Sequence, residues 1–274
     1  MYLGVDVGGT KTLVAVLDNH GAIKEKTVFP TSQNYDNFLL ELRHTLAHFE
    51  HQEFKAGGVG VAGRIDRKHG RRFPSGKLSW DGVPIQSDVQ RIADCPIVVE
   101  NDAKMAGLSE AMMVKDEFRR VLYLTVSTGI GFALVVDGII DTSIGDRGGT
   151  NIMLEHRGKH ISWENLISGR AIVRRFGKKA RDINDRPTWQ TIARDLSRGL
   201  IEVVAVTEPE VVIIGGSVGS YFDRYGKLLA KELAGYDLPA VMLPKLREAQ
   251  RPEEAVVYGC YDLAKQVYAH ANVD

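Results

Sequence analysis

The chain has 274 residues, of which 44% are hydrophobic and 26% charged, a size that favours two domains over one. Its 35 basic and 35 acidic residues give a formal net charge of +0, which argues against a nucleic-acid or polyanion partner. Cys95 and Cys260 are far apart in apolar segments, so we expect buried thiols in a reducing compartment. The chain begins on an apolar strand pattern and has no apolar run of about 18 residues, so we expect a soluble cytoplasmic protein without a membrane segment.

The first 17 residues predict two strands joined by a glycine turn. Residues 2–7 alternate as a strand, and a second apolar run covers residues 13–17. Glycine lets the backbone of such a turn approach an anion, so we expect a phosphate-binding turn formed by Gly8, Gly9, Thr10 and Lys11. Asp6, at the strand end, is a candidate ligand for hydrated Mg²⁺. The alternative is an ordinary hairpin turn.

The next segments predict a strand at 22–28, a helix at 34–50 and a strand at 59–62 that ends at Gly63. At Gly63 the backbone can approach a ligand, and the following Arg64 can donate to a hydroxyl group. The alternative is a basic, solvated loop containing Arg64, Arg67, Lys68, Arg71 and Arg72.

A buried strand at 96–99 leads into Asn101 and Asp102, which open a predicted helix at 103–113. A carboxylate at this place can accept a proton from an attacking hydroxyl. The alternative for both residues is an ordinary helix cap.

After the charged residues 115–120 the opening pattern returns. Strands are predicted at 121–126 and 132–136, separated by a turn that contains Thr128 and Gly129. Two such hairpins suit a clamp in which each turn contributes N–H groups to a phosphate chain. We therefore divide the chain into domains at 1–115 and 116–274.

The remaining chain predicts helices at 172–180 and 188–206, and an apolar strand at 211–214 that runs into Gly215 and Gly216. Such a glycine pair lets a flat ligand lie on bare backbone. A last helix is expected at 255–265 and is assigned to the second domain.

These motifs together resemble the ROK family of sugar kinases, glucokinase-like and N-acetylhexosamine kinase-like members of the actin-like ATPase superfamily. The resemblance is carried by Asp6–Lys11, residues 100–103, the turn at 127–131, Trp163–Ala171 and residues 211–218. It implies an α/β, two-domain actin-like (ribonuclease-H-like) fold that binds ATP in an interdomain cleft and phosphorylates a sugar hydroxyl. It further implies that the last helix packs near the hinge. It also implies that Asp102 is the general base, and that the sugar ligands are Asn101, Glu164, Gly63, Arg64 and Thr150. For Glu164 the alternative is a carboxylate favoured at a helix N-terminus.

The sequence departs from the family pattern in three places. Thr150 and Met153 stand where the family has Glu and His, and Lys77 stands where it has Asn. The family's cysteine ligands are absent and His156 and His160 do not replace them, so we predict that zinc is missing. The sugar is left open between hexoses and N-acetylhexosamines, and the phosphoryl donor between ATP and polyphosphate.

Members of the family are commonly homodimers, so a homodimer is expected. Many ROK proteins are transcription regulators with an N-terminal helix-turn-helix, an alternative that the phosphate turn beginning at residue 6 disfavours. The other alternative is a protein that binds nucleotide or sugar without turning it over, which the changes at Thr150 and Met153 would support.

Overall fold

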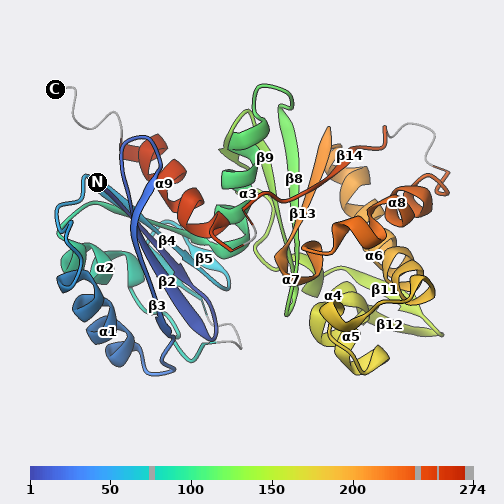
Figure 1. Cartoon of the computed structure of the whole chain (residues 1–274), viewed down its shortest axis with the longest axis horizontal. Coiled ribbons are helices and arrows are strands. Elements are labelled where there is room, and N and C mark those ends of the chain that lie inside the picture. The colour runs from blue at the N-terminus through green and yellow to red at the C-terminus, as the bar shows by residue number, and fades with distance from the viewer. Residues whose placement is uncertain (74–77, 238–241, 252, 269–274) are drawn as a thin grey trace. The chain divides into compact units, whose positions relative to one another are not determined.

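The computed structural model describes residues 1–73, 78–237, 242–251 and 253–268 (Figure 1). The chain divides into two compact units. The first unit comprises Met1–Met112 and Glu254–Asp274, and the second comprises Met113–Glu253. Each unit contains a five-stranded sheet flanked by helices, as expected for an α/β protein.

The first unit is organised by a sheet with the strand order β3-β2-β1-β4-β7. Strands β1 (Tyr2–Val7), β2 (Lys11–Leu17) and β3 (Ile23–Pro30) are antiparallel neighbours because short turns join them. Strands β4 (Ala56–Val61) and β7 (Ile97–Asn101) run parallel to β1. The connections contain α1 (Tyr35–Ala47), the short strands β5 (Ile65–Asp66) and β6 (Arg71–Arg72), and α2 (Ile85–Ala93).

Alternate residues of β1 face opposite sides of this sheet, as the twofold periodicity of a strand requires. Leu3 and Val5 are fully buried in the core that contains the apolar residues of α1 and α2. Tyr2 belongs to a second core with Val257 and Tyr261 of α9 (Ala255–Tyr268). The last helix thus lies on the sheet of the first unit, which differs from its expected place in the second domain (Figure 1).

The second unit repeats the strand order of the first. Its sheet runs β10 (Ile139–Ile140), β9 (Ile130–Val136), β8 (Arg120–Val126), β13 (Val211–Gly215) and β14 (Lys245–Glu248). Strand β8 pairs antiparallel with β9 and parallel with β13, as β1 does with β2 and β4. The expected repetition of the strand, turn and strand design is therefore present in the structure.

The core of the second unit lies between this sheet and the long helix α6 (Arg186–Thr207), which packs along α8 (Phe222–Leu233) (Figure 1). The hairpin β11 (Met153–His156) and β12 (Lys159–Ser162) leads into α4 (Trp163–Ile167) and α5 (Gly169–Phe176). Three short turns complete the unit: 3₁₀ turns at Gly148–Thr150 and Ala180–Asp182, and the single helical turn α7 (Gly216–Gly219).

Helix α5 differs from the helix expected at 172–180. It begins three residues earlier because the Ser168 hydroxyl accepts a hydrogen bond from the Ala171 amide at 3.3 Å. It ends at Phe176 because Gly177 adopts a left-handed conformation, with φ of 69°. No helix in the described part of the chain is long and apolar enough to cross a membrane.

Candidate functional site

The carboxyl ends of three parallel strands gather the polar residues of the first unit. The register aligns Asp6 of β1 with Gly60 of β4, and Gly60 with Glu100 of β7. Asn101 ends β7, and Asp102 begins α3 (Asp102–Val114). Residues far apart in the sequence thereby meet at one edge of the sheet, where ligands of open α/β sheets bind.

Asp6 and Asp102 form the electrostatic centre of this edge. Burial, followed by repulsion from the Asp102 carboxylate, raises the pKa of Asp6 to about 7, and Lys11 partly opposes the rise. The Asp6 side chain is partly exposed, so it can still be reached by a ligand. Two neighbouring carboxylates offer the hard oxygen ligands that Mg²⁺ prefers, and these residues therefore fit a divalent cation.

The Asn101 side chain is held on both sides. Its amide nitrogen donates to the Gly63 carbonyl at 2.9 Å, and its amide oxygen accepts from the Lys104 backbone N–H at 3.2 Å. Gly63 has a φ of 117°, a conformation that any residue with a Cβ atom strongly disfavours. The structure thus brings together two residues, Gly63 and Asn101, that the sequence analysis assigned to the same ligand.

The segment after Gly63 is not a solvated basic loop throughout. Arg67 donates two hydrogen bonds of 2.6 Å to the buried Glu100 carboxylate, which also accepts the Asn101 backbone N–H. Arg72 is completely buried. Its guanidinium donates to the carbonyls of Ala62, Leu78 and Trp80. The solvated-loop interpretation is therefore wrong for Arg72, whereas Arg67 is exposed but paired with Glu100.

Arg64 is exposed, and its guanidinium lies 4.6 Å from the centre of the Phe73 ring. The departure from the family pattern at Lys77 lies outside the described residues.

The first glycine turn connects β1 to β2. The Gly8 amide donates to the Lys11 carbonyl at 3.1 Å, and the Thr10 carbonyl accepts from the Thr31 amide at 3.0 Å. Thr10 and Lys11 are exposed, and Gly8 and Gly9 are half-buried. The turn therefore presents a hydroxyl and an ammonium group beside Asp6.

The second glycine turn, Ser127–Gly129, connects β8 to β9. Its Ser127 carbonyl accepts from the Gly169 amide at 2.6 Å, and its Thr128 carbonyl accepts from the Arg170 side chain at 3.0 Å. The start of α5 is thus tied to this turn. Gly129 lies against Glu164, since a Cβ atom at Gly129 would be 2.3 Å from a carboxylate oxygen of Glu164.

Glu164 lies in the first turn of α4 but does not cap that helix. Ser162 is the cap, accepting from the Asn165 amide at 3.2 Å. The Glu164 carboxylate instead accepts from the Ile130 amide at 3.0 Å and from the Thr150 hydroxyl at 3.4 Å, and it pairs with Arg170 at 3.2 Å. Met153, which was aligned with the family's His, is 55% exposed at the start of β11.

The second unit contains a pocket of about 540 Å³ beside the second glycine turn, Ser127–Gly129. Its cationic lining comes from Arg170, Lys179 and Arg181, and among the residues that the structure describes none that lines it is acidic. The rest of the lining is apolar surface and hydroxyl groups. Val173, Ala180, Val218 and the Tyr221 ring supply the apolar surface, and Thr128, Ser217 and Tyr221 carry the hydroxyl groups. A pocket of this size can hold a nucleotide, and its charge favours an anionic one.

The glycine pair at 215–216 shapes one wall of this pocket. Gly216 has a φ of 83°, and a Cβ atom there would lie 2.6 Å from the Val126 carbonyl oxygen. Only glycine allows this turn, which places Ser217 and Val218 in the pocket wall. The sequence analysis identified the glycines but missed Lys179, Arg181 and Tyr221. These three residues belong to no motif, and only the fold brings them to the glycines.

The hairpin of β11 and β12 occupies the region where the family's zinc ligands were expected to be missing. His156 faces Arg198 at 3.5 Å between ring and guanidinium nitrogens, and His160 lies opposite Glu155. Within the described residues, no three His, Cys, Asp or Glu side chains are grouped as a metal site. The absence of zinc stays a prediction.

A family model described as the ROK family matches residues 2–267 of this chain. The chain belongs to the ROK family. The N-acetyl-D-glucosamine kinase of Shigella flexneri serotype 5b (strain 8401) is 25% identical over 298 residues, which cover 94% of this chain and 97% of that protein.

Two solved ROK structures are also similar. The ROK glucokinase from Streptomyces griseus, solved with glucose and AMPPNP, has a TM-score of 0.82 at 23% identity, covering 97% of this chain and 99% of its own. A ROK transcriptional regulator, a homolog of the E. coli MLC protein, has a TM-score of 0.84 at 17% identity and covers 97% of this chain but 78% of its own. These likenesses confirm the expected α/β actin-like fold, and the family model confirms the expected family.

Proposed function

We propose that this ROK protein is a sugar kinase that transfers the γ-phosphoryl group of ATP to a hydroxyl of a hexose or N-acetylhexosamine. The hydroxyl oxygen attacks the γ-phosphorus, the bond from that phosphorus to the bridging oxygen breaks, and ADP leaves. The Asp102 carboxylate takes the hydroxyl proton. A general base of this kind contributes about 10²–10⁴-fold to the rate.

Acceptor contacts are proposed in each unit separately. In the first, Asn101 is fixed by the Gly63 carbonyl and Lys104 amide, so its orientation is set before a sugar binds. In the second, Glu164 is already surrounded by donors from Ile130, Thr150 and Arg170. A carboxylate held in this way has its orientation set and remaining lone pairs for sugar hydroxyls. Gly63, Arg64 and Thr150 are proposed as further acceptor contacts.

Donor contacts are likewise proposed unit by unit: the cationic pocket and the second glycine turn in the second unit, and the first glycine turn in the first unit. Thr128 and Arg170 place a hydroxyl and a positive charge at the end of the pocket near the second turn. Tyr221 and Val218 offer apolar surface for a flat base. On this assignment Gly8, Gly9, Thr10, Lys11 and Gly129 contribute to phosphate binding, and Gly215 and Gly216 to nucleoside binding.

Mg²⁺ would be held at Asp6, with Asp102 close by. When bound, the cation neutralises charge on the phosphate chain. The protein's own part is to keep two carboxylates together at the end of β1 and the start of α3. Lys11 adds a positive charge that already acts on Asp6 in the structure.

The observation that supports this proposal is the placement of Asp6 and Asp102 at the strand ends, where burial first and then repulsion from Asp102 raise the pKa of Asp6 to about 7. Its test is ADP release with Mg-ATP over a panel of hexoses and N-acetylhexosamines. We expect turnover of at least one sugar in the wild type and a loss of about 10²-fold or more in Asp102→Asn. Asp116→Asn, which changes an exposed carboxylate outside the site, is the matched control.

The second candidate function is a protein that binds nucleotide or sugar without turnover. Two observations favour it: the Thr150 and Met153 departures, and the likeness to a ROK regulator. It predicts no ADP release with any sugar, but a higher melting temperature with ATP or sugar that Asp102→Asn leaves in place.

The donor is tested separately by replacing ATP with polyphosphate. The apolar wall of the pocket favours a nucleoside. We therefore expect ATP to be used, and Tyr221→Ala to impair the use of ATP but not of polyphosphate.

A further inference from the structure

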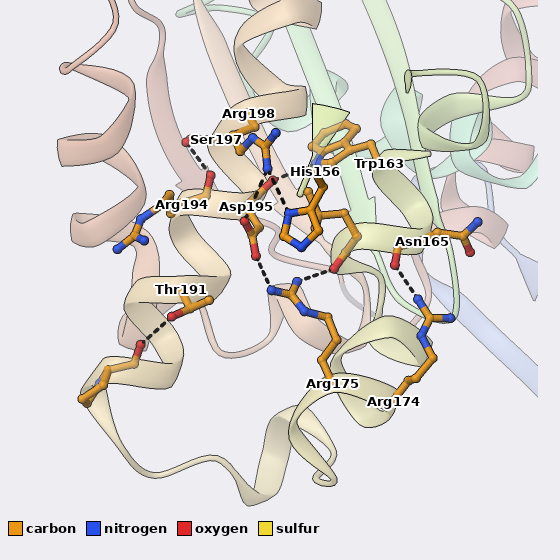
Figure 2. Close-up of polar contacts among 12 residues, drawn as sticks. His156, Trp163, Asn165, Arg174, Arg175, Thr191, Arg194, Asp195, Ser197 and Arg198 are labelled. Atoms are coloured by element: carbon orange, nitrogen blue, oxygen red, sulfur yellow. Dashed lines mark hydrogen bonds and ion pairs between the residues drawn. The ribbon is translucent and has the colours of Figure 1, made fainter. Parts of the chain in front are cut away.

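Helix α6 carries a buried carboxylate that pairs with one arginine of α5 and one of α6. Asp195 is 5% exposed, and its side chain pairs with Arg175 of α5 at 2.7 Å and with Arg198 of α6 at 3.9 Å (Figure 2). A buried carboxylate is stable only when it is paired and hydrogen-bonded. Asp195 therefore determines where both guanidinium groups lie.

The two guanidinium groups hold the segments on either side of Glu164. Arg175 donates to the Leu166 carbonyl of α4 at 2.5 Å, and Arg198 donates to the Glu155 carbonyl of β11. The backbone carbonyl of Asp195 itself accepts from the Trp163 indole at 3.2 Å (Figure 2). The Asp195 backbone carbonyl thus contacts the first residue of α4 directly. The Asp195 carboxylate reaches the fourth residue of α4, Leu166, through Arg175.

Helix α4 needs this support because it has five residues, too few for a helix to be stable alone. It lies very close to α6: a Cβ atom at Gly199 would be 2.1 Å from the Trp163 ring. Glu164 follows Trp163 directly, so the direction of its carboxylate depends on how α4 is seated. The bond from the Ile130 amide to that carboxylate is a local reporter of its position.

We propose that the Asp195 carboxylate makes this residue a positioning residue for the acceptor sugar, holding α4 through Arg175 so that Glu164 stays in its binding orientation. The proposal rests on the assignment of Glu164 to the sugar site in the proposed function. It adds residues that do not touch the sugar but set its affinity.

The first test does not require activity. Hydrogen exchange of the Ile130 amide is compared in the wild type, Asp195→Asn and Glu232→Gln. Glu232 is the matched control. Its carboxylate forms an ion pair of 4.0 Å with Arg194, which neighbours Asp195 on α6 but lies outside the network of Asp195, Arg175 and Arg198. We expect the Ile130 amide to exchange at least about tenfold faster in Asp195→Asn and unchanged in Glu232→Gln.

A variant that keeps the positive charge covers the case in which Asp195→Asn does not fold. In Arg175→Lys one ammonium group replaces the fork that reaches both Asp195 and the Leu166 carbonyl, so the Ile130 amide should again exchange faster. If the Ile130 amide exchanges at the wild-type rate in every variant that folds, Asp195 does not position Glu164 and the proposal is overturned.

The second test uses kinetics. We expect the acceptor KM to rise about tenfold in Asp195→Asn, equivalent to about 1.4 kcal/mol, with the ATP KM within about twofold of the wild type. Adding Asp195→Asn to Glu164→Gln should raise the acceptor KM little further, since both changes act through one group. An equal rise in both KM values would mean general loosening and would overturn the proposal. Absence of turnover in the wild type would refute the proposed function alone, because the exchange test still decides the role of Asp195.

Discussion

Asp6→Asn is expected to make the protein more stable at neutral and alkaline pH. In the folded protein the pKa of Asp6 is raised to about 7 from an ordinary value of 3.8. The folded state therefore disfavours the ionised carboxyl, whereas the unfolded chain ionises it freely. The difference corresponds to about 4 kcal/mol at about 1.36 kcal/mol per pKa unit, and this is the upper limit of the gain.

The sign follows from the direction of the rise. Below pH 3.8 the carboxyl is protonated in both states, so the wild type bears no penalty there. As the pH rises from 3.8 to about 7, the unfolded state releases the proton and the folded state retains it, so the wild type loses stability. Above pH 7 the loss is complete. Asn has no such titration, so the variant gains relative to the wild type over this window.

The measurement is urea unfolding at pH 4, 6 and 8, with EDTA present to remove divalent cations. We expect the midpoint difference between Asp6→Asn and the wild type to grow with pH at constant m-value. The control Asp116→Asn should show no such growth. In an Asp102→Asn background the difference should shrink, because the repulsion that contributes to the raised pKa is gone. A difference that is independent of pH, or a variant less stable than the wild type at pH 8, would refute the reasoning.

Three further changes test other parts of the structure. Gly259→Ala should destabilise the first unit by about 3 kcal/mol, because a Cβ atom there would lie 1.9 Å from the Met105 carbonyl oxygen. Thermal unfolding measures this loss, and a variant with the wild-type melting temperature would contradict the prediction. Asp18→Asn should lower the melting temperature at pH 7 but not near pH 2. The Lys24 hydrogen bond and backbone amides lower the pKa of Asp18 to about 2, so the stabilisation by its carboxylate is lost as the pH falls through that value. An equal effect at both pH values would show that charge is not involved. Tyr221→Ala should weaken ATP binding about tenfold and leave the sugar KM unchanged; calorimetry with ATP checks the first part, and unaltered ATP binding would remove Tyr221 from the donor site.

Sequence reasoning located both glycine hairpins and the start of α3 because these features are local. Alternating apolar residues around a glycine turn determine a strand pair within about 16 residues. Asp102 could likewise be placed at a strand end from the apolar run that precedes it. Helices α2 and α8 were not predicted, although apolar residues recur along both at helical spacing: Ile85, Val89 and Ala93 in α2, and Tyr225, Leu229 and Leu233 in α8.

The sequence by itself determined the family, the duplicated hairpins and most of the proposed contact residues, because each of these depends on a few neighbouring positions. Only the tertiary structure decided which distant residues meet: Asp6 with Asp102, Arg67 with Glu100, and Asp195 with Arg175. It also placed α9 on the sheet of the first unit and Tyr221 in the pocket wall. The physical reason is that strand order and helix packing are properties of the whole core. A carboxylate's partner, and hence its pKa, is known only when the elements that carry both groups have been placed.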